Sequence, residues 1–231
     1  MARPPRLVIW AKMLHLRMQA TAAARREKVV MSTFAWRKYI IFGAPLVLGI
    51  LELGHPAVLP GDNIAATIMP IATWWTVLHV LQVPLFALLG IAVFLIVCDL
   101  DGRAAVTSQY TAAVFAVVYP AFDAAVGVAS GVLCGTTITT DLEASLQELF
   151  WGPVTGLMAI IGSSAWLTAL LAAAWAWRQH GAPILVSAFL AISGVLLAIG
   201  HIRPFGPLAC ASLLAGAVTI AGAKGRTRAA A

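Results

Sequence analysis

The chain has 231 residues, of which 61% are hydrophobic and only 10% are charged. A single soluble core cannot bury that much apolar surface, so the composition excludes an ordinary soluble globular protein and favours a protein embedded in a lipid bilayer. The net charge of +6 does not indicate a nucleic-acid partner, because the basic residues lie beside hydrophobic segments, where anionic lipid headgroups attract them.

Residues 1–36 form a basic arm that precedes the first hydrophobic segment. The stretch 7–18 is broken by Lys12, His15 and Arg17, so it lacks the continuous apolar core of a cleaved signal peptide. It could form a basic amphipathic helix on the membrane surface. The alternative is that translation starts at Met31 and that the first 30 residues are dispensable.

Six long apolar segments follow, and a helix needs about 20 apolar residues to cross a bilayer. They cover residues 39–57, 67–97, 105–134, 151–177, 182–200 and 205–223. These runs are continuously apolar and rich in Ala and Leu, which favours helices over strands. We therefore predict an all-α fold, a bundle of six transmembrane helices in one domain at residues 37–224, followed by a short tail at 225–231.

Prolines and a polar connection subdivide these segments. Three prolines predict helix starts or kinks, because proline removes a backbone donor: Pro70, Pro84 and Pro120. Between the third and fourth segments, Thr140 followed by Glu143 matches a capping box. Leucines at helical spacing come next, at Leu142, Leu146 and Leu149. This pattern predicts a short helix at the outer surface.

Lysine and arginine residues collect in alternate connections. The residues before the first segment, the second and fourth connections and the residues after the sixth segment hold all of them except Arg203. The positive-inside rule then predicts a multi-pass protein of the cell membrane with both termini in the cytoplasm. The expected partners are the lipid bilayer and, at the cytoplasmic face, anionic headgroups. Of the three cysteines, Cys134 and Cys210 fall toward the outer side, where two separate thiols are favoured over one disulfide.

Small residues recur in the third segment. Gly127, Gly131 and Gly135 are spaced four residues apart, so they line one helical face and let another helix approach closely. Asp123 and Tyr119 continue the same row, which would direct Asp123 into a packed interior. The seam could join helices of one chain or of two copies, so a homo-oligomer through this face is one alternative.

Six polar side chains are predicted to share the outer half of the bilayer: Glu52, His55, His79, Gln82, Asp123 and His201. Glu52 and His55 are three residues apart, as are His79 and Gln82, so each pair should share a helical face. Helical rise puts His79 and Asp123 roughly 17 Å deep, with Glu52 and His55 nearer the surface. Ionisable groups inside a membrane usually face a bundle interior or a cavity, which predicts an outward-facing polar pocket.

Three hypotheses for this pocket follow. The leading one is a polar core for packing, assembly or passage of a proton or small solute, with His79 bonded to Asp123. The alternative is a membrane-embedded metal-dependent enzyme that acts on a lipid or other apolar substrate. Zinc or iron would have His55, His79 and Asp123 as ligands, with Glu52 as general base. The third, a haem or quinone site, is disfavoured because His79 has no predicted partner histidine at its own depth.

Overall fold

In this computed structural model the described residues are 36–136 and 141–229, with side chains described as far as residue 223. The described backbone is helical and contains no strand, which confirms the all-α class. The chain divides into two compact units, residues 1–39 and 40–231, and apart from residues 36–39 the features below belong to the second. The predictions for residues 7–18, for Met31 and for Thr140 lie outside the described residues.

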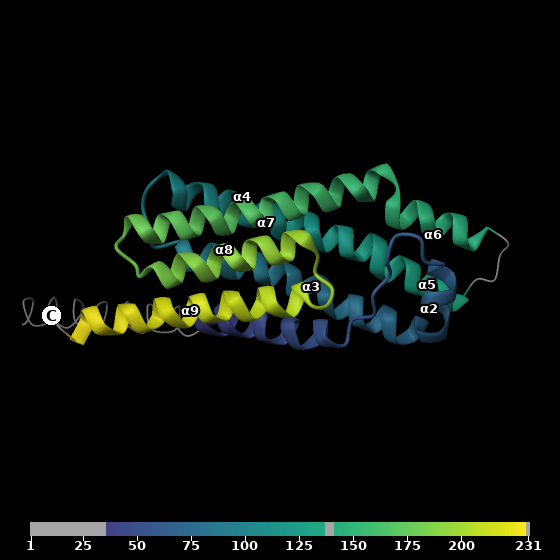
Figure 1. Ribbon diagram of the computed structural model, residues 1–231, viewed down its shortest axis with the longest axis horizontal. Helices are drawn as coiled ribbons and strands as arrows, with labels where there is room; N and C mark the ends of the chain where they lie inside the picture. The colour runs from purple at the N-terminus through teal and green to yellow at the C-terminus, as the bar shows by residue number, and fades with distance from the viewer. Residues whose placement is uncertain (1–35, 137–140, 230–231) are drawn as a thin grey trace, which may run out of the picture. The chain divides into compact units, whose positions relative to one another are not determined.

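All six predicted segments form helices, several of them interrupted (Figure 1). Their bounds are: a first helix described over residues 36–53, α2 (Ile64–Ile68), the 3-10 turn η1 (Met69–Ile71), α3 (Ala72–Val97), α4 (Arg103–Asp123), the π-helical turn η2 (Ala124–Val128), α5 (Ala129–Thr136), α6 (Leu142–Trp151), α7 (Pro153–Gln179), α8 (Ile184–Ile199) and α9 (Phe205–Ala229). Consecutive helices pack side by side, α3 on α4, α7 on α8 and α8 on α9, and α4 also packs on α7.

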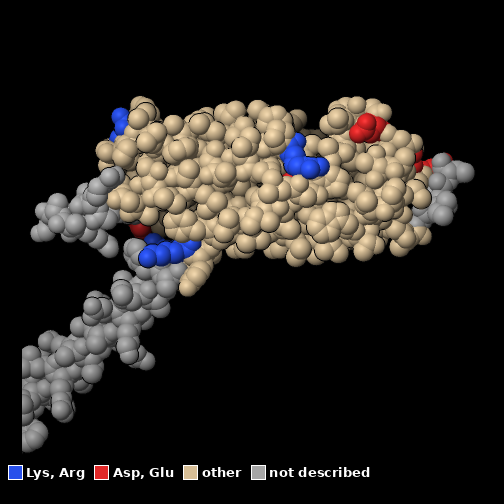
Figure 2. All heavy atoms as spheres, turned by 60° about the horizontal axis from the view of Figure 1, so that its bottom comes forward, with Lys and Arg blue, Asp and Glu red and all other residues tan. Residues whose placement is uncertain are grey.

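Four stretches of the described chain are long and apolar enough to cross a membrane: Ile64–Val97, Arg103–Thr136, Leu142–Gln179 and Phe205–Ala223. The apolar α8 has 16 residues and is about 24 Å long, short of the roughly 30 Å hydrocarbon core of a bilayer. The space-filling view shows a broad uncharged surface on one face, with most charged side chains toward its ends (Figure 2). These helices are compatible with an integral membrane protein.

The first helix ends at residue 53 and not at the predicted residue 57. Its last turn tightens, since Gly54 N donates to Leu51 O at 3.0 Å and His55 N donates to Glu52 O at 3.2 Å. Pro56 then disfavours helical backbone at His55. The prediction that Glu52 and His55 share a helical face was therefore wrong, because His55 lies beyond the end of the helix.

Helices of two lengths make up the bundle. The stretches Ile64–Val97 and Arg103–Thr136 each have 34 residues, about 50 Å. Figure 1 shows α8 and α9 joined partway along the bundle, whereas α2, α5 and α6 lie further out at one end, here called the α6 end. The short elements therefore stop beside the middle of the long ones, and this is where the buried polar side chains gather.

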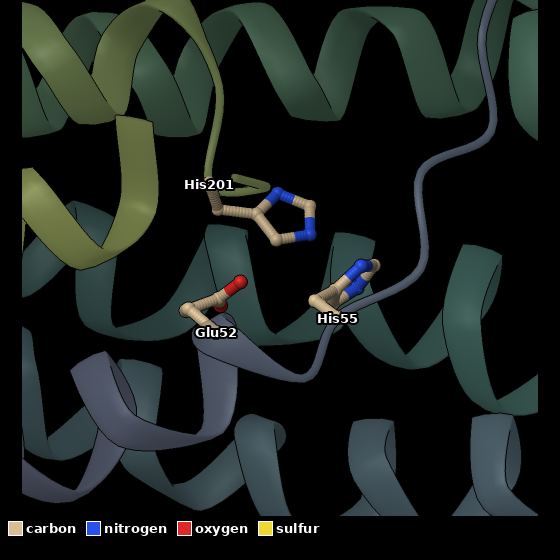
Figure 3. A group of neighbouring side chains, drawn as sticks. All are labelled: Glu52, His55 and His201. Atoms are coloured by element: carbon tan, nitrogen blue, oxygen red, sulfur yellow. The ribbon is translucent and has the colours of Figure 1, made fainter. Parts of the chain in front are cut away.

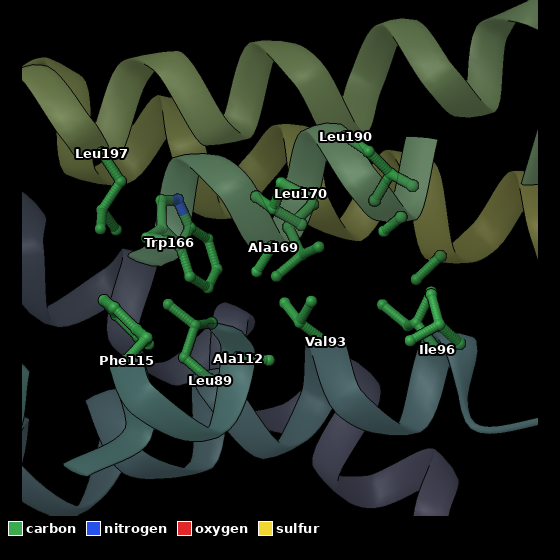
Figure 4. Close-up of a cluster of buried hydrophobic side chains, with 14 of the residues drawn as sticks. Leu89, Val93, Ile96, Ala112, Phe115, Trp166, Ala169, Leu170, Leu190 and Leu197 are labelled. Atoms are coloured by element: carbon green, nitrogen blue, oxygen red, sulfur yellow. The ribbon is translucent and has the colours of Figure 1, made fainter. Parts of the chain in front are cut away.

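Two separate hydrophobic cores form as a result. The larger lies among α3, α4, α7, α8 and α9 and is centred on aromatic rings; the Phe115 and Trp166 centroids are 4.7 Å apart (Figure 4). The smaller lies at the α6 end and contains Ile64, Ile68, Ala72, Trp75, Cys134, Leu142 and Leu146. Both cores consist mainly of apolar side chains, so the polar layer between them needs its own stabilising contacts.

Proline explains two of the interruptions. Pro70 lies in η1, where α2 gives way to α3. Pro120 lies in α4 shortly before η2, in which the Ala129 N–H reaches back five residues to Ala124 O. Pro84 remains inside α3. Widened turns of this kind frequently accompany functional sites, and η2 directly follows Asp123.

The glycine row of the third segment faces α3 of the same chain. A Cβ added at Gly127 would overlap the His79 ring, and one at Gly131 would overlap the Thr76 side chain. At Gly135 a Cβ would make only an ordinary contact, 3.8 Å from Ala72 Cβ. At Gly127 and Gly131 the close helix packing is thus within one chain. This part of the row is not on a surface open to a second copy. The three cysteines are free, so the disulfide alternative is not formed.

The predicted short helix is present as α6, with Leu142 and Leu146 buried. The described partners of the Glu143 carboxylate include a segment far away in the chain. The carboxylate accepts from the backbone N–H groups of Ile64 at 3.1 Å and Ala65 at 2.8 Å, which are the first residues of α2. Glu143 therefore joins α6 to the start of α2 by two hydrogen bonds. The two backbone donors would otherwise lack a partner within their helix.

Glu143→Ala should weaken the contact between α6 and α2 and lower the free energy of unfolding by about 1–2 kcal/mol, because two backbone donors lose a charged acceptor. Hydrogen exchange of the 58–72 segment should become faster. Glu148→Ala is the matched control, because Glu148 is an exposed carboxylate on the same helix. Equal exchange in both variants would contradict this role of Glu143.

Candidate functional site

The structure brings together all six polar residues of the predicted pocket. Glu52 ends the first helix, His55 follows it, and His201 lies in the loop between α8 and α9. His79 and Gln82 come from α3 and Asp123 from the end of α4. Five are buried, and His201 is partly buried. They occupy the layer between the two hydrophobic cores.

Two imidazole rings, those of His55 and His79, meet edge-on at the centre of this layer. His55 Nδ1 lies 2.6 Å from the Pro56 carbonyl oxygen, and His79 Nδ1 lies 2.7 Å from the Trp75 carbonyl oxygen. A carbonyl only accepts, so each Nδ1 carries a proton and, in a neutral ring, each Nε2 bears a lone pair. The two Nε2 atoms are 3.2 Å apart. Two lone pairs at this distance repel each other unless they share a proton or a metal ion.

This pairing corrects the predicted depths. His55 was expected nearer the surface than His79, and His79 was expected to have no histidine at its level. The structure places them in contact because α2 and η1 extend the second segment toward the α6 end, while the first helix stops at residue 53. The argument used against a two-histidine ligand set therefore does not hold.

A second grouping shares His55. Ligand atoms of Glu52, His55 and His201 all lie within 4.8 Å of one another. Figure 3 shows the three side chains pointing toward one another from the helix end, the following segment and the α8–α9 loop. Gln82 Nε2 donates to Glu52 Oε1 at 2.7 Å and so holds the carboxylate in place. This set of three includes Glu52 where the sequence-based ligand set had Asp123.

His201 is oriented by an aromatic wall. Its Nδ1 lies 3.0 Å from the Tyr119 hydroxyl oxygen, and its ring meets Phe86 edge-on with centroids 5.6 Å apart. Burial lowers the pKa of His201 well below its ordinary value, and the nearby imidazoles of His55 and His79 lower it further. The ring is therefore neutral, as a metal ligand must be.

Asp123 stands apart from that grouping. Its Oδ1 is 4.0 Å from His79 Nε2, beyond hydrogen-bond distance. The expected bond between His79 and Asp123 is thus not formed, and Glu52 is bonded by Gln82 and not by His55. Within the described residues, four buried polar atoms of this layer have no hydrogen-bond partner: Glu52 Oε2, Gln82 Oε1, Asp123 Oδ2 and His201 Nε2. Such atoms are costly in a dry interior unless they meet a ligand.

A cavity of about 430 Å³ opens beside the cluster. Its polar lining comes from His55, His79, Tyr119, Asp123, Ser163 and His201. The remaining walls are mostly aliphatic and aromatic and belong to η2, α6, α7 and the end of α8. Asp123 lines the cavity and Glu52 does not, which is the reverse of the roles assigned to these two carboxylates from the sequence.

Trp75 and Ser130 support the site and were not singled out from the sequence. Trp75 Nε1 donates to the Gly127 carbonyl at 2.9 Å and lies 3.0 Å from Ser130 Oγ. Trp75 also fixes His79 through its own carbonyl. The sequence could have indicated a role for Trp75, because it lies four residues before His79 on the same helical face. An aromatic residue at helical spacing, however, is usually part of a hydrophobic core and has no other role.

Comparison with protein-family models, curated proteins and solved structures finds no match to this chain. The function is therefore argued from the fold and from the chemistry of the site.

Proposed function

We propose that this chain is a multi-pass protein of the cell membrane, with six crossing helices and both termini in the cytoplasm. The support is the placement of basic residues in alternate connections, where they would also contact anionic headgroups. The α6 end then faces outward. Helices of about 50 Å exceed the bilayer core of about 30 Å, so the α6 end would project beyond it. The polar layer would lie near the outer boundary, where α8 ends.

The histidine cluster, which consists of His55, His79 and His201, binds one divalent transition-metal ion, zinc or iron. The observation that carries this proposal is the pair of Nε2 lone pairs of His55 and His79, 3.2 Å apart, each oriented by a backbone carbonyl. Ligands about 2.0 Å from a tetrahedral zinc ion are roughly 3.3 Å apart, so the pair already has ligand spacing. Carbonyl acceptors on the far ring nitrogen are the usual support of metal-bound histidines. Ligand atoms of Glu52 and His201 lie within 4.8 Å of a ligand atom of His55, so these two residues are the candidates for further ligands.

Two other roles fit the geometry less well. A packing network should satisfy its own polar atoms, yet four buried atoms of this layer have no partner within the described residues. Passage of a proton or solute needs polar groups beyond the layer. Instead, Phe86 adjoins Tyr119 and His201, and behind it Phe115 and Trp166 belong to an apolar core.

The activity proposed is metal-dependent chemistry on an apolar substrate held in the adjoining cavity. A bound divalent ion would polarise a substrate oxygen or activate a water molecule. Asp123 faces the cavity with a free carboxylate oxygen, so it is better placed than Glu52 to take a proton there. Glu52, bonded to Gln82, suits a ligand role.

The test is metal content. Protein purified in detergent should contain about one zinc or iron ion per chain by elemental analysis. After chelation it should bind one Co²⁺ with the visible absorption of a tetrahedral site. His55→Ala should lower metal content at least tenfold, since His55 belongs to both groupings.

His180→Ala is the control. His180 is an exposed histidine whose Nδ1 also lies 2.9 Å from a backbone carbonyl, that of Ala176, so the variant loses an imidazole without touching the cluster. Metal-free wild-type protein that also fails to bind Co²⁺ would overturn the metal proposal. That result would favour a role of the polar layer in packing or in permeation.

A further inference from the structure

The cavity beside the cluster opens sideways and not along the bundle. Three residues that line it are also well exposed on the side of the helices: Trp151 is 49% exposed, Ile160 65% and Ile199 61%. The short α8 ends at Ile199 and leaves the outer turns of α7 uncovered on that side. The mouth is therefore framed by apolar side chains on the side of the bundle, at the level where α8 ends and beyond it.

Without a metal ion, the lining disfavours an anionic ligand. Among the described residues that line the cavity there is no lysine or arginine, and the carboxylate is that of Asp123. In chelated protein a phosphate or carboxylate head would be buried close to this acidic group, which is unfavourable. Arg203 follows the lining residue Ile202 but is exposed. The volume of about 430 Å³ is at the lower end of drug-sized pockets, too small for a lipid with two chains.

The inner end of the cavity holds a hydrogen-bond acceptor that has no donor among the described residues. Asp123 is 2% exposed, lines the cavity, and has no partner for Oδ2 among the described residues. A carboxylate oxygen accepts hydrogen bonds, so the matching group on a ligand is a hydrogen-bond donor, and a hydroxyl is the uncharged donor that suits apolar walls. His79 and Tyr119 lie next to Asp123 in the lining and would surround the same head.

We propose that this cavity binds a single-chain amphiphile with an uncharged hydroxyl head, the chain in the apolar part and the hydroxyl on Asp123. The proposal rests on the proposed function in that the hydroxyl would then lie beside the metal ligands, as a substrate of that same site. Binding itself depends on the cavity and Asp123, so it can be measured without metal.

Two adjacent serines provide a matched pair of variants. Ser163 lines the cavity, whereas Ser164 is exposed on the outer face of α7. Ser163→Phe should fill the cavity, and Ser164→Phe adds the same ring where nothing opposes it. Asp123→Leu removes the acceptor, while Asp123→Asn keeps a neutral oxygen acceptor in its place.

The probe is ω-bromododecanol, compared with ω-bromododecanoate, on full-length protein in lipid nanodiscs, as purified and after chelation. Bromine quenches tryptophan fluorescence on contact, and Trp75 and Trp151 line the cavity. We expect saturable quenching by the alcohol, reduced at least tenfold in affinity by Ser163→Phe and Asp123→Leu. Ser164→Phe should leave it unchanged, and Asp123→Asn should retain most of it. Trp151→Phe should remove much of the signal.

In chelated protein the alcohol should bind at least tenfold more tightly than the carboxylate. Equal or tighter binding of the carboxylate in that sample, or quenching that Ser163→Phe does not weaken, would overturn the proposal. Alcohol binding by a protein that is metal-free as purified and also fails to bind Co²⁺ would refute only the metal proposal. A metal-loaded protein that shows no saturable quenching by the alcohol would refute only this one.

Discussion

Gly127→Ala is expected to abolish metal binding and to destabilise the protein by about 2–3 kcal/mol. A Cβ at this position would overlap the His79 ring, and a ring locked between two helices cannot move away without losing its hydrogen bond to the Trp75 carbonyl. Overpacking of this kind typically costs about 1–3 kcal/mol. Elemental analysis and unfolding in mixed micelles measure the two effects on one sample.

Gly135→Ala is the control for this change. It lies two steps further along the same row, and its added Cβ would make only an ordinary 3.8 Å contact with Ala72. Metal content should stay at the wild-type level. A Gly127→Ala protein with full metal content would mean that the His79 ring can move away from Gly127 and still bind the ion, or that it is not a ligand.

Trp166→Ala should be the most destabilising single change in the larger core, by about 3–5 kcal/mol. The indole is fully buried, lies 4.7 Å from the Phe115 ring, and donates from Nε1 to the Ser193 carbonyl at 3.2 Å. Its loss leaves a large void between α4, α7 and α8 and removes the hydrogen bond from the indole to the Ser193 carbonyl. Thermal unfolding in detergent, with titration by a denaturing detergent, gives the change in free energy.

Trp175→Ala tests whether burial is the cause. Trp175 is on the same helix but is 62% exposed, so the same truncation should cost less than about 1 kcal/mol in a micelle. Similar losses for both variants would contradict the assignment of Trp166 as the centre of the core. Metal content of Trp166→Ala, measured in protein that remains folded, should be less affected than in Gly127→Ala.

Much of the fold could be read from the chain. The long apolar runs lower their free energy only by forming helices in an apolar setting, and each of the six runs is helical. The grouping of polar residues was also accessible, since an ionisable side chain such as His79 or Asp123 in an apolar run must face the interior. The short helix α6 followed from its leucine spacing.

Helix ends and side-chain partners could not be read in this way. Sequence spacing put His55 on a helical face with Glu52, whereas Pro56 ends the helix and turns His55 toward His79. A depth calculated from helical rise assumes that all segments begin at one level, and α2 and η1 violate that assumption. The partner of Glu143 is a helix start about 80 residues away in the chain, which no local motif encodes.

The sequence by itself therefore determined the class of protein, the helical segments and the set of polar residues in the interior, because burial and helical geometry act on local patterns. Only the tertiary structure decided which atoms of that set face one another. The pairing of His55 with His79, the grouping of Glu52 with His201 and the position of Asp123 on the cavity depend on where short helices stop against long ones. That register is set by packing between distant segments and not by spacing within one.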